Sequence, residues 1–420
     1  MRILFVSHSH PGLTKGGAEM AAHDLYTEMG KTHETWFLGC TRDPNAMRTG
    51  APFSQPFGER EYIYACGEFD WFHFANRDPR FPAAFRALLQ DLRPDVVHFH
   101  HYLNIGVEAL LIARDTLPEA RIILTLHEYL ALCNHHGQLV TTEHYTLCSQ
   151  ASPRRCNRCF PDQSTSDFTL REMYIKRFFD VVDHFVSPSA FLAERYCQWG
   201  IARAKMSVIE NPCLPMSTGT ASVAPRAPAG TTGIEPRALR AGFFGQISRL
   251  KGINVVFDAA RILDQSSDAD IVFEIHGDYS GQPKAFQDDF ISRLATAGTN
   301  VRYRGPYDRE QLARLMQTVD VALVPSIWWE NSPLVIQEAR QQGLPVICSD
   351  IGGMKEKVRP EIDGWHFPAG DAVSLAGVLK DLSARREKLH AIGRGKRHPS
   401  GNRATRDLLG LHEQLMSSRT

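Results

Sequence analysis

Residues 324–348 read Val-Pro-Ser-Ile-Trp-Trp-Glu-Asn-Ser-Pro-Leu-Val-Ile-Gln-Glu-Ala-Arg-Gln-Gln-Gly-Leu-Pro-Val-Ile-Cys, and this stretch decides the fold. A buried strand ends at Pro325 and a loop follows. A helix then begins at Ser332-Pro333, because serine favours the cap and proline favours the first helical position. Gly343 ends the helix, and the last apolar run predicts a second strand. Strand, helix and strand in this order form the repeating unit of a parallel α/β sheet.

The same alternation extends along the chain. Most apolar runs are continuous, as expected for parallel strands with helices on both faces. The first half predicts helices at 18–29, 107–115, 170–182 and 190–199 and strands at 3–7, 35–38, 95–100, 122–126, 184–187 and 207–209. The second half predicts helices at 253–263, 286–297, 309–319 and 333–342 and strands at 241–244, 271–276, 301–303, 321–324 and 345–348. The fold class is therefore α/β, with doubly wound parallel sheets.

The length of the chain and one change of composition predict two domains. A chain of 420 residues exceeds what one hydrophobic core usually serves. Residues 213–238 are rich in Pro, Gly, Ser and Thr, which is typical of a linker. We therefore expect an N-terminal domain at 1–212, a C-terminal domain at 239–393, and a tail at 394–420 in which residues 405–416 form a closing helix.

Charge and cysteine content limit the setting. Lys with Arg and Asp with Glu both number 47, so the net charge does not indicate a nucleic acid partner. The apolar run within Met1–His8 is too short for a secretory signal, and no run reaches the ~18 residues of a spanning helix. Nine cysteines, an odd number without a signal peptide, favour a reducing compartment. We therefore expect a cytoplasmic protein.

The start of the predicted helix at 333–342 has the features of an anion site. The amides of Leu334 and Val335 are free at a helix N-terminus, where phosphate binds readily. Glu338 shares a helical stripe with both residues, and a carboxylate on an apolar stripe needs a partner. That partner is either a ligand hydroxyl, such as a ribose diol, or an ordinary basic side chain or solvent.

Glycine-rich turns follow a strand in each half. In the second half, Gly245-Gln-Ile-Ser-Arg-Leu-Lys-Gly252 carries Arg249 and Lys251, whose charges suit a diphosphate. The alternative is an ordinary strand–helix turn whose basic residues face solvent. In the first half, Gly16-Gly17 follows the first strand and opens a helix, which also permits close approach of the backbone to a ligand.

A histidine follows the predicted strand at 122–126. His127 lies at the carboxyl end of a parallel strand, where open α/β sheets place their ligands. It is either a polar group directed into a site or a histidine that simply caps the strand. Other histidines also follow strands, and we expect them to line an acceptor side at most: His8, His98, His100 and His101.

Four cysteines lie in an insertion at about 133–160. Cys156 and Cys159 form a Cys-x-x-Cys pair that can supply two thiolates to a structural zinc or iron–sulfur site. Cys133 and Cys148 would complete the four ligands. The alternative is an oxidisable loop without a metal.

The Glu-x7-Glu pattern formed by Glu330 and Glu338 resembles the donor site of retaining GT-B glycosyltransferases, especially family 4. The surrounding Pro-Ser…Glu…Ser-Pro-Leu…Glu-Ala…Gly-Leu-Pro-Val-Ile is similar to that family nearly residue by residue. Thr-Leu-His-Glu-Tyr at 125–129 resembles the family's Thr-x-His-Asp-Tyr. The resemblance covers the region up to residue 212 and about residues 240–382, and the second region carries the more specific motifs.

The resemblance implies a GT-B architecture, with two Rossmann-like domains facing a central cleft. It also implies sugar transfer from a nucleotide-diphosphate sugar to a saccharide or lipid-linked acceptor, with retention and without a metal or other cofactor, as in cell-surface polysaccharide biosynthesis. Glu338 would bind the ribose, Glu330 the donor sugar, and His127 would lie beside the reacting sugar. The remaining donor contacts would come from Gly16, Gly17, Gln246, Arg249, Lys251 and the amides of Ser332, Leu334 and Val335.

Some features leave room for other interpretations. The family usually has Gly-Arg where this chain has Gly245-Gln246, so Arg249 would have to compensate in holding the diphosphate. A nucleotide-sugar epimerase of the same fold, or a non-catalytic scaffold stabilised by metal, are the alternative functions. The segment 170–179 mixes basic and aromatic residues. It is either a peripheral contact at the inner face of a membrane or a core stripe beside a solvated face.

Overall fold

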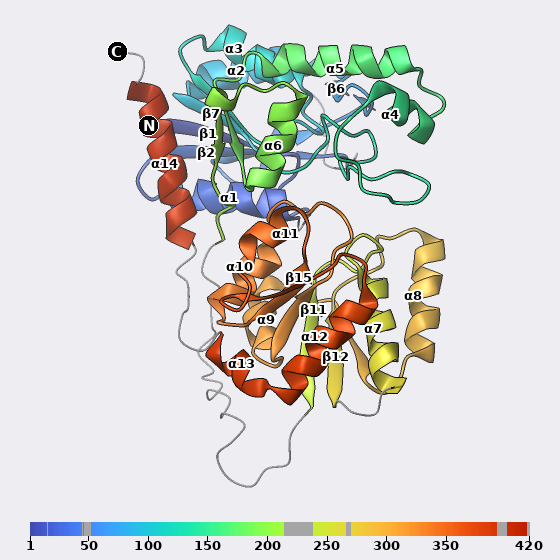
Figure 1. The fold of residues 1–420 in the computed structure, drawn as a ribbon. Coiled ribbons are helices and arrows are strands. Elements are labelled where there is room, and N and C mark those ends of the chain that lie inside the picture. Colours follow the sequence, from blue (N-terminus) through green and yellow to red (C-terminus); the bar gives the residue numbers. More distant parts are fainter. Residues whose placement is uncertain are drawn as a thin grey trace. The chain divides into compact units, whose positions relative to one another are not determined.

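The computed structural model describes residues 1–14, 16–43, 45, 52–213, 238–265, 270–392 and 401–417. The chain divides into two compact units (Figure 1). Unit 1 comprises Met1–Pro212 with Gly401–Thr420, and unit 2 comprises Cys213–Ser400. Of the predicted linker, residues 214–237 lie outside the described residues, as do residue 393 at the end of the predicted C-terminal domain and residues 394–400 of the predicted tail.

Unit 1 is built on an eight-stranded sheet in the order β10-β9-β8-β7-β1-β2-β4-β3. All neighbours pair in parallel except β3, which pairs with β4 in the antiparallel sense. The strand order reverses between β1 and β7. The strands are β1 Arg2–Val6, β2 Glu34–Thr41, β3 Phe53–Gly58, β4 Glu61–Ala65, β7 Val96–Phe99, β8 Arg121–Thr125, β9 His184–Ser187 and β10 Met206–Val208.

Helices cover this sheet, and a short hairpin of β5 (Phe69–Asp70) and β6 (Ala75–Asn76) stands apart from it. The helix at the end of the chain belongs to unit 1, where Leu408 and Leu411 join a core with Ile3 and Phe5. The helices are α1 Gly17–Met29, α2 Phe81–Leu92, α3 Glu108–Thr116, α4 Pro153–Cys159, α5 Thr165–Phe179, α6 Ala190–Trp199 and α14 Gly401–Ser417.

Unit 2 has a six-stranded, wholly parallel sheet in the order β13-β12-β11-β14-β15-β16. This is the Rossmann order, and it reverses between β11 and β14. The strands are β11 Leu239–Phe244, β12 Ile271–His276, β13 Val301–Gly305, β14 Val321–Val324, β15 Val346–Ser349 and β16 Gly364–Phe367. The helices are α7 Ile253–Gln265, α8 Lys284–Thr296, α9 Arg309–Met316, α10 Leu334–Gln341, α11 Gly352–Lys357, α12 Ala372–Ala384 and α13 Arg386–Ala391.

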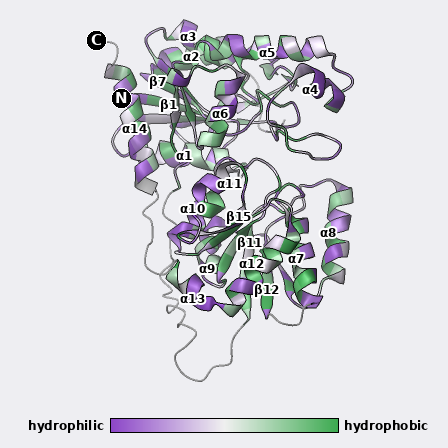
Figure 2. Cartoon of the chain, in the orientation of Figure 1, coloured by the Kyte–Doolittle hydropathy of each residue, from purple (hydrophilic) through white to green (hydrophobic). Residues whose placement is uncertain are grey.

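The hydropathy pattern explains this layering. Figure 2 shows strands that are mostly hydrophobic and helices that carry both hydrophobic and hydrophilic residues. In unit 2, Phe273 and Leu323 from the sheet pack with Val256 from α7 and Leu379 from α12 in one buried cluster. The predicted α/β class with doubly wound parallel sheets is confirmed. Among the described residues, no helix is both long and apolar enough to cross a membrane.

Some predicted elements differ from the structure. Helix α10 begins at Leu334, and Pro333 is its cap with an extended ψ of 118°, so the predicted cap at Ser332 was wrong by one residue. Helix α5 begins earlier than predicted because Ser164 and Asp167 form a capping box before it. Strand β3 was missed because it contains a proline and a glycine, which an edge strand tolerates.

Candidate functional site

Two loops meet where the strand order of unit 2 reverses. One follows β11 at 245–252 and the other follows β14 at 325–333. The amide of Ile327 donates to the carbonyl oxygen of Leu250 at 2.8 Å. Gly252 has a φ of +77°, and a Cβ there would lie 1.8 Å from the carbonyl oxygen of Pro325. Only glycine allows the two loops to pack this closely.

Glu330 is the polar centre of these loops. Its side chain is almost fully buried, and its Oε1 accepts hydrogen bonds from Lys251 Nζ at 2.6 Å, Ser326 Oγ at 2.8 Å and Trp328 Nε1 at 3.0 Å. None of these three contacts involves Oε2. Lys251 also lies 5.8 Å from the centre of the Trp328 ring. Two residues predicted separately from the sequence, Lys251 and Glu330, therefore form one ion pair.

The loop that carries Glu330 rests on the start of α11. The amide of Gly353 donates to the carbonyl oxygen of Glu330 at 2.6 Å. A Cβ at Gly353 would lie 1.7 Å from the carbonyl oxygen of Asn331, and one at Gly352 would lie 2.8 Å from that of Glu330. These contacts between α11 and the Glu330 loop were not predicted, although two consecutive glycines after a predicted strand indicate a close approach of the backbone.

The first turn of α10 adjoins the same loop. In the described part of the chain, no hydrogen bond is made by the amides of Leu334 or Val335, whereas the Ile336 amide donates to the carbonyl oxygen of Pro333 at 3.0 Å. Glu338 lies one turn further along and is half-buried. Burial, together with the charge of Glu338, raises the pKa of Tyr307. Such a helix start suits an anionic group.

The loop after β11 contributes the remaining predicted residues of unit 2. Gly245 has a φ of +122°, and nothing lies within 4 Å of a Cβ at this position. Backbone conformation and not lack of space therefore calls for glycine here. Gln246 and Arg249 are exposed beside it. The structure thus brings Gly245, Lys251, Glu330 and the start of α10 to one edge of the sheet.

Histidines gather at the corresponding edge of unit 1. His100 Nδ1 lies 3.1 Å from His127 Nε2, and the two rings are inclined by 27°. His101 Nε2 lies 2.9 Å from Glu128 Oε1. Deeper in the unit, His98 contacts Thr125 Oγ1 at 2.7 Å and His412 of α14 at 3.2 Å. The carboxyl ends of β7 and β8 therefore carry a connected group of imidazoles.

These buried histidines should make the protein sensitive to mild acid. Burial lowers the pKa of His8 to about 4 and those of His100 and His412 to about 3. The unfolded chain binds these protons near pH ~6.5 and the folded chain does not, so the free energy of unfolding falls as the pH drops below ~6.5. Each such histidine contributes up to about 1.4 kcal/mol per pH unit.

Urea unfolding at pH about 7.5, 6.5 and 5.5 measures this slope above the range in which carboxylates titrate. His100→Asn should reduce the slope. His144→Gln should not change it, because that side chain is 76% exposed. Equal stability at the three pH values would contradict the expectation.

Two glycines follow β1, and side-chain packing explains why the first of them is a glycine. Gly16 is the cap of α1, and Gly17 is the first residue of that helix. A Cβ at Gly16 would lie 2.4 Å from a carboxylate oxygen of Glu19. The other Glu19 oxygen accepts from Thr14 Oγ1 at 2.6 Å and lies 3.5 Å from His8 Nε2. The absence of a Cβ at Gly16 therefore makes room for the buried Glu19.

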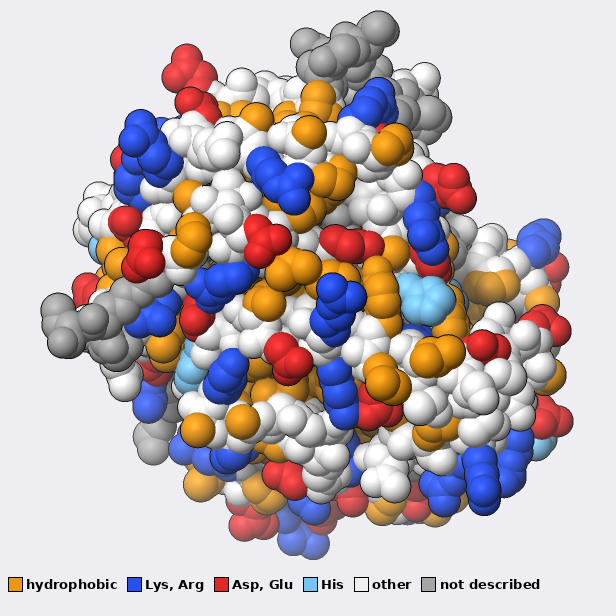
Figure 3. Space-filling view, turned by 90° about the horizontal axis from the view of Figure 1, so that it is seen from above, with side chains coloured by type: hydrophobic (Ala, Val, Ile, Leu, Met, Phe, Trp, Pro, Cys, Tyr) orange, Lys and Arg blue, Asp and Glu red, His pale blue; other side chains and the backbone are white. Residues whose placement is uncertain are grey.

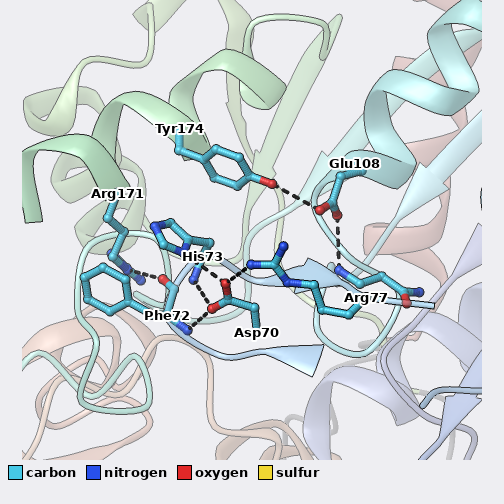
Figure 4. A network of polar contacts seen from close by, with 8 residues as sticks. Asp70, Phe72, His73, Arg77, Glu108, Arg171 and Tyr174 are labelled. Carbon is cyan, nitrogen blue, oxygen red and sulfur yellow. Dashed lines mark hydrogen bonds and ion pairs between the residues drawn. The ribbon is translucent and has the colours of Figure 1, made fainter. Parts of the chain in front are cut away.

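A polar network links the β5–β6 hairpin with α5 and α3 (Figure 4). The buried guanidinium of Arg171 in α5 donates to the carbonyl oxygens of Phe72 at 2.7 Å, Leu130 at 2.7 Å and Ala131 at 2.8 Å. Asp70 contacts Arg77 Nη2 at 2.6 Å and His73 Nδ1 at 3.0 Å, and these contacts help to lower its pKa to about 2 against the opposing effect of burial. Tyr174 donates to Glu108 at 3.1 Å.

The buried side of α5 is part of the core, since Phe168, Ile175 and Phe178 are covered. On its outer side Leu170 and Met173 are 59% and 63% exposed. Figure 3, which looks down on the view of Figure 1, shows basic, acidic and apolar side chains interspersed on the visible face. A peripheral membrane contact at 170–179 stays a prediction.

The four cysteines of the insertion are free thiols. Burial raises the pKa of Cys133 to about 11, and Cys148 and Cys156 are near enough to add to the shift. Among the described residues, three ligand atoms within 4.8 Å of one another occur only in a different group, His10, His23 and Glu61. The four cysteines, including Cys159, therefore lie near one another, and a structural metal on them stays a prediction.

The tautomer of His10 argues against a metal in the group with His23 and Glu61. The amide of Gly12 donates to His10 Nδ1 at 3.0 Å, so the neutral ring carries its proton on Nε2. That Nε2 lies 2.7 Å from a Glu61 oxygen and donates to it. A protonated ring nitrogen cannot bind a metal, and the group is explained by hydrogen bonding alone.

Solved structures match the whole chain. The Anabaena protein HepE in complex with UDP-glucose covers 99% of this chain and 99% of its own length, with a TM-score of 0.64 and 16% identity. Sucrose-phosphate synthase from Thermosynechococcus elongatus covers 100% of both chains, with a TM-score of 0.70 and 17% identity. At this identity the likeness concerns the fold. The two Rossmann-like units thus define a GT-B fold.

Each half of the chain matches the model of a protein family. Residues 15–213 match Glycosyltransferase Family 4, and residues 232–398 match Glycosyl transferases group 1. Together the two matches cover most of the chain, and each corresponds closely to one of its two units.

Curated relatives carry names of the same class. A D-inositol 3-phosphate glycosyltransferase of Salinispora tropica is 30% identical over 42% of this chain and 38% of its own length. The amylovoran biosynthesis glycosyltransferase AmsK of Erwinia amylovora is 31% identical over 33% of this chain and 34% of its own. A D-inositol 3-phosphate glycosyltransferase of Mycobacterium sp. is 25% identical over 69% and 59%, respectively. The chain therefore spans less than two thirds of each of these relatives.

Proposed function

We propose that this protein transfers a sugar from a nucleotide-diphosphate sugar to a saccharide or lipid-linked acceptor. The observation that carries the proposal is the Lys251–Glu330 pair at 2.6 Å, held where the sheet order of unit 2 reverses. Open α/β sheets bind their ligands at that point. The names of the relatives, and UDP-glucose in the complex with HepE, support the same class of donor.

The donor would use the groups that meet at this edge of unit 2. The diphosphate would accept from the amides of Leu334 and Val335 and from the side chains of Arg249 and Lys251. Glu338, one turn further along α10, would bind the ribose hydroxyls. Glu330 Oε2 would face the donor sugar, because Oε1 already has three donors. Gln246 would contact the donor beside Gly245.

We propose that transfer retains the anomeric configuration and needs no metal. Lys251, Arg249 and the amides at the start of α10 together supply positive charge for the departing diphosphate. In unit 1, His127 would lie beside the reacting sugar, and the backbone at Gly16 and Gly17 would approach the donor. All nine cysteines are free, which supports a reducing, cytoplasmic setting.

Glu338→Gln should weaken binding of the donor nucleotide. Losing a charge-assisted hydrogen bond to a ribose hydroxyl costs roughly 1.5–3 kcal/mol, which is about ten- to a hundredfold in Kd. Calorimetry with UDP and with GDP measures the effect. Glu310→Gln is the matched control, because Glu310 is an exposed carboxylate in the first turn of α9. Unchanged affinity in Glu338→Gln would remove the ribose assignment.

A panel of nucleotide sugars, screened by thermal shift, identifies the donor because a bound ligand stabilises the folded chain. Product formation with and without acceptors then tests the reaction itself. Transfer that requires an acceptor supports the proposal. Conversion of the donor sugar without an acceptor would indicate an epimerase. Stoichiometric metal on the cysteines, together with no binding of UDP or GDP, would indicate a scaffold.

A further inference from the structure

His100 and His127 leave neighbouring strands at the same edge of unit 1. Strands β7 and β8 pair in parallel, with Phe99 opposite Leu124, so the residues that follow them are brought together. His100 is 1% exposed, and its Nδ1 lies 3.1 Å from His127 Nε2. One of these two nitrogens must donate and the other must accept.

The second nitrogen of His100 decides between the two arrangements. His100 Nε2 is buried and has no hydrogen-bond partner among the described residues. The ring is neutral at ordinary pH, since burial lowers its pKa to about 3, and so it carries one proton. If that proton were on Nε2, a buried N–H would lack an acceptor, which is a rare and costly state. Placing the proton on Nδ1 avoids this cost, because Nδ1 can donate to His127.

We propose that His100 is a positioning residue for His127. Its Nδ1–H donates to His127 Nε2, and His127 therefore carries its own proton on Nδ1. Any ligand atom that meets Nδ1 of His127 must then be an acceptor, such as a sugar oxygen. His127 acts as a hydrogen-bond donor and not as a base, because its unprotonated nitrogen is occupied by His100. The role in sugar transfer rests on the proposed function, whereas the direction of the hydrogen bond does not.

Nuclear magnetic resonance of protein labelled with 15N in the histidine rings tests the direction without an activity assay. Protonated and unprotonated ring nitrogens have well-separated 15N shifts, and the signals are assigned by their loss in His100→Asn and His127→Gln. We expect protonated Nδ1 and unprotonated Nε2 in both residues. A proton on Nε2 of His127 would overturn the proposal.

Two substitutions of His100 test the positioning role. The side-chain amide of asparagine can occupy the position of Nδ1–H, so His100→Asn should keep the His127 tautomer and most of kcat. His100→Leu removes the donor and should lower kcat about tenfold, the worth of one buried hydrogen bond. The Kd for UDP should change less than about twofold, because the predicted nucleotide contacts at Arg249, Lys251 and Glu338 lie in unit 2.

His184→Asn is the matched control. His184 makes a hydrogen bond of the same kind, with Ser207 Oγ at 2.8 Å, but lies at the start of β9 and not at the carboxyl edge. This variant should keep both kcat and the His127 tautomer. Equal kcat in His100→Leu and His100→Asn would overturn the positioning role. If the protein transfers sugar from no donor, the proposed function fails and the 15N spectra alone decide the direction of the hydrogen bond.

Discussion

Replacing Glu330 by glutamine should lower the rate of sugar transfer by roughly two orders of magnitude, as expected when a buried electrostatic contact to the reacting centre is lost. In the folded protein Glu330 Oε1 accepts from Lys251, Ser326 and Trp328. An amide cannot balance the charge of Lys251, and it introduces two N–H donors where the surrounding groups are themselves donors. Lys251 should therefore lose its counter-charge and change its orientation.

The free energy of unfolding should fall by about 1–3 kcal/mol, the range for a hydrogen bond to a charged group, which leaves most molecules folded when the total is roughly 5–15 kcal/mol. Steady-state kinetics and urea unfolding of the same preparation separate the two effects. In Glu330→Ala we likewise expect turnover to fall by more than the loss of folded protein can explain. A normal rate in either variant would remove Glu330 from the proposed mechanism.

Asp363→Asn provides the control for this experiment. Asp363 is also a buried carboxylate of unit 2, and it pairs with Arg359 at 2.6 Å. It precedes β16 and lies outside the two loops that carry Lys251 and Glu330. We expect a similar loss of stability with the transfer rate preserved. If Asp363→Asn reduced the rate as much as Glu330→Gln, the loss would reflect damage to unit 2 as a whole.

Removing residues 401–420 should unfold much of unit 1, although these residues are the last in the chain. Leu408 and Leu411 of α14 pack against Ile3, Phe5 and Leu25, and Leu408 is only 2% exposed. The Nε of Arg121 in β8 donates to the carbonyl oxygen of Leu415 at 2.7 Å. Leu408→Ala alone should cost about 2–5 kcal/mol, against a typical total of roughly 5–15 kcal/mol.

Hydrogen exchange measured by mass spectrometry locates the effect. Leu408→Ala and the deletion should speed exchange in β1 and α1, while β11 and β12 of unit 2 keep their protection. Gln414→Ala is the control, because this side chain of α14 is exposed and should change stability by less than about 0.5 kcal/mol. Unchanged exchange in β1 after the deletion would show that α14 does not stabilise unit 1.

Local sequence patterns predicted where helices and strands lie better than they predicted which of these segments pack against one another. Continuous apolar runs predicted β12, β14 and β9 with their observed bounds, because a strand buried on both faces has a distinctive composition. The edge strand β3 and its neighbour β4 were missed, since partly exposed segments lack that signal. The closing helix was expected from its amphipathic pattern, but a pattern within α14 cannot say which unit it joins.

The candidate site shows the same limit. Glu330, Glu338 and Lys251 were chosen from motifs, yet the pairing of Lys251 with Glu330 spans 79 positions. Glu330 is also supported by contacts that were not predicted from the motif, with Ser326, Trp328 and the glycine pair at 352–353. The four cysteines of the insertion were also chosen from a motif, and the structure brings them near one another in the fold.

The sequence by itself determined the α/β class and the positions of most strands, and it supplied the candidate residues of the proposed donor site, because these depend on neighbours in the chain. Only the tertiary structure decided the strand orders, the partner of Glu330, the unit that α14 completes, and the contact between His100 and His127. Each of these depends on segments far apart in the chain that become neighbours only when a sheet forms and its apolar faces are covered.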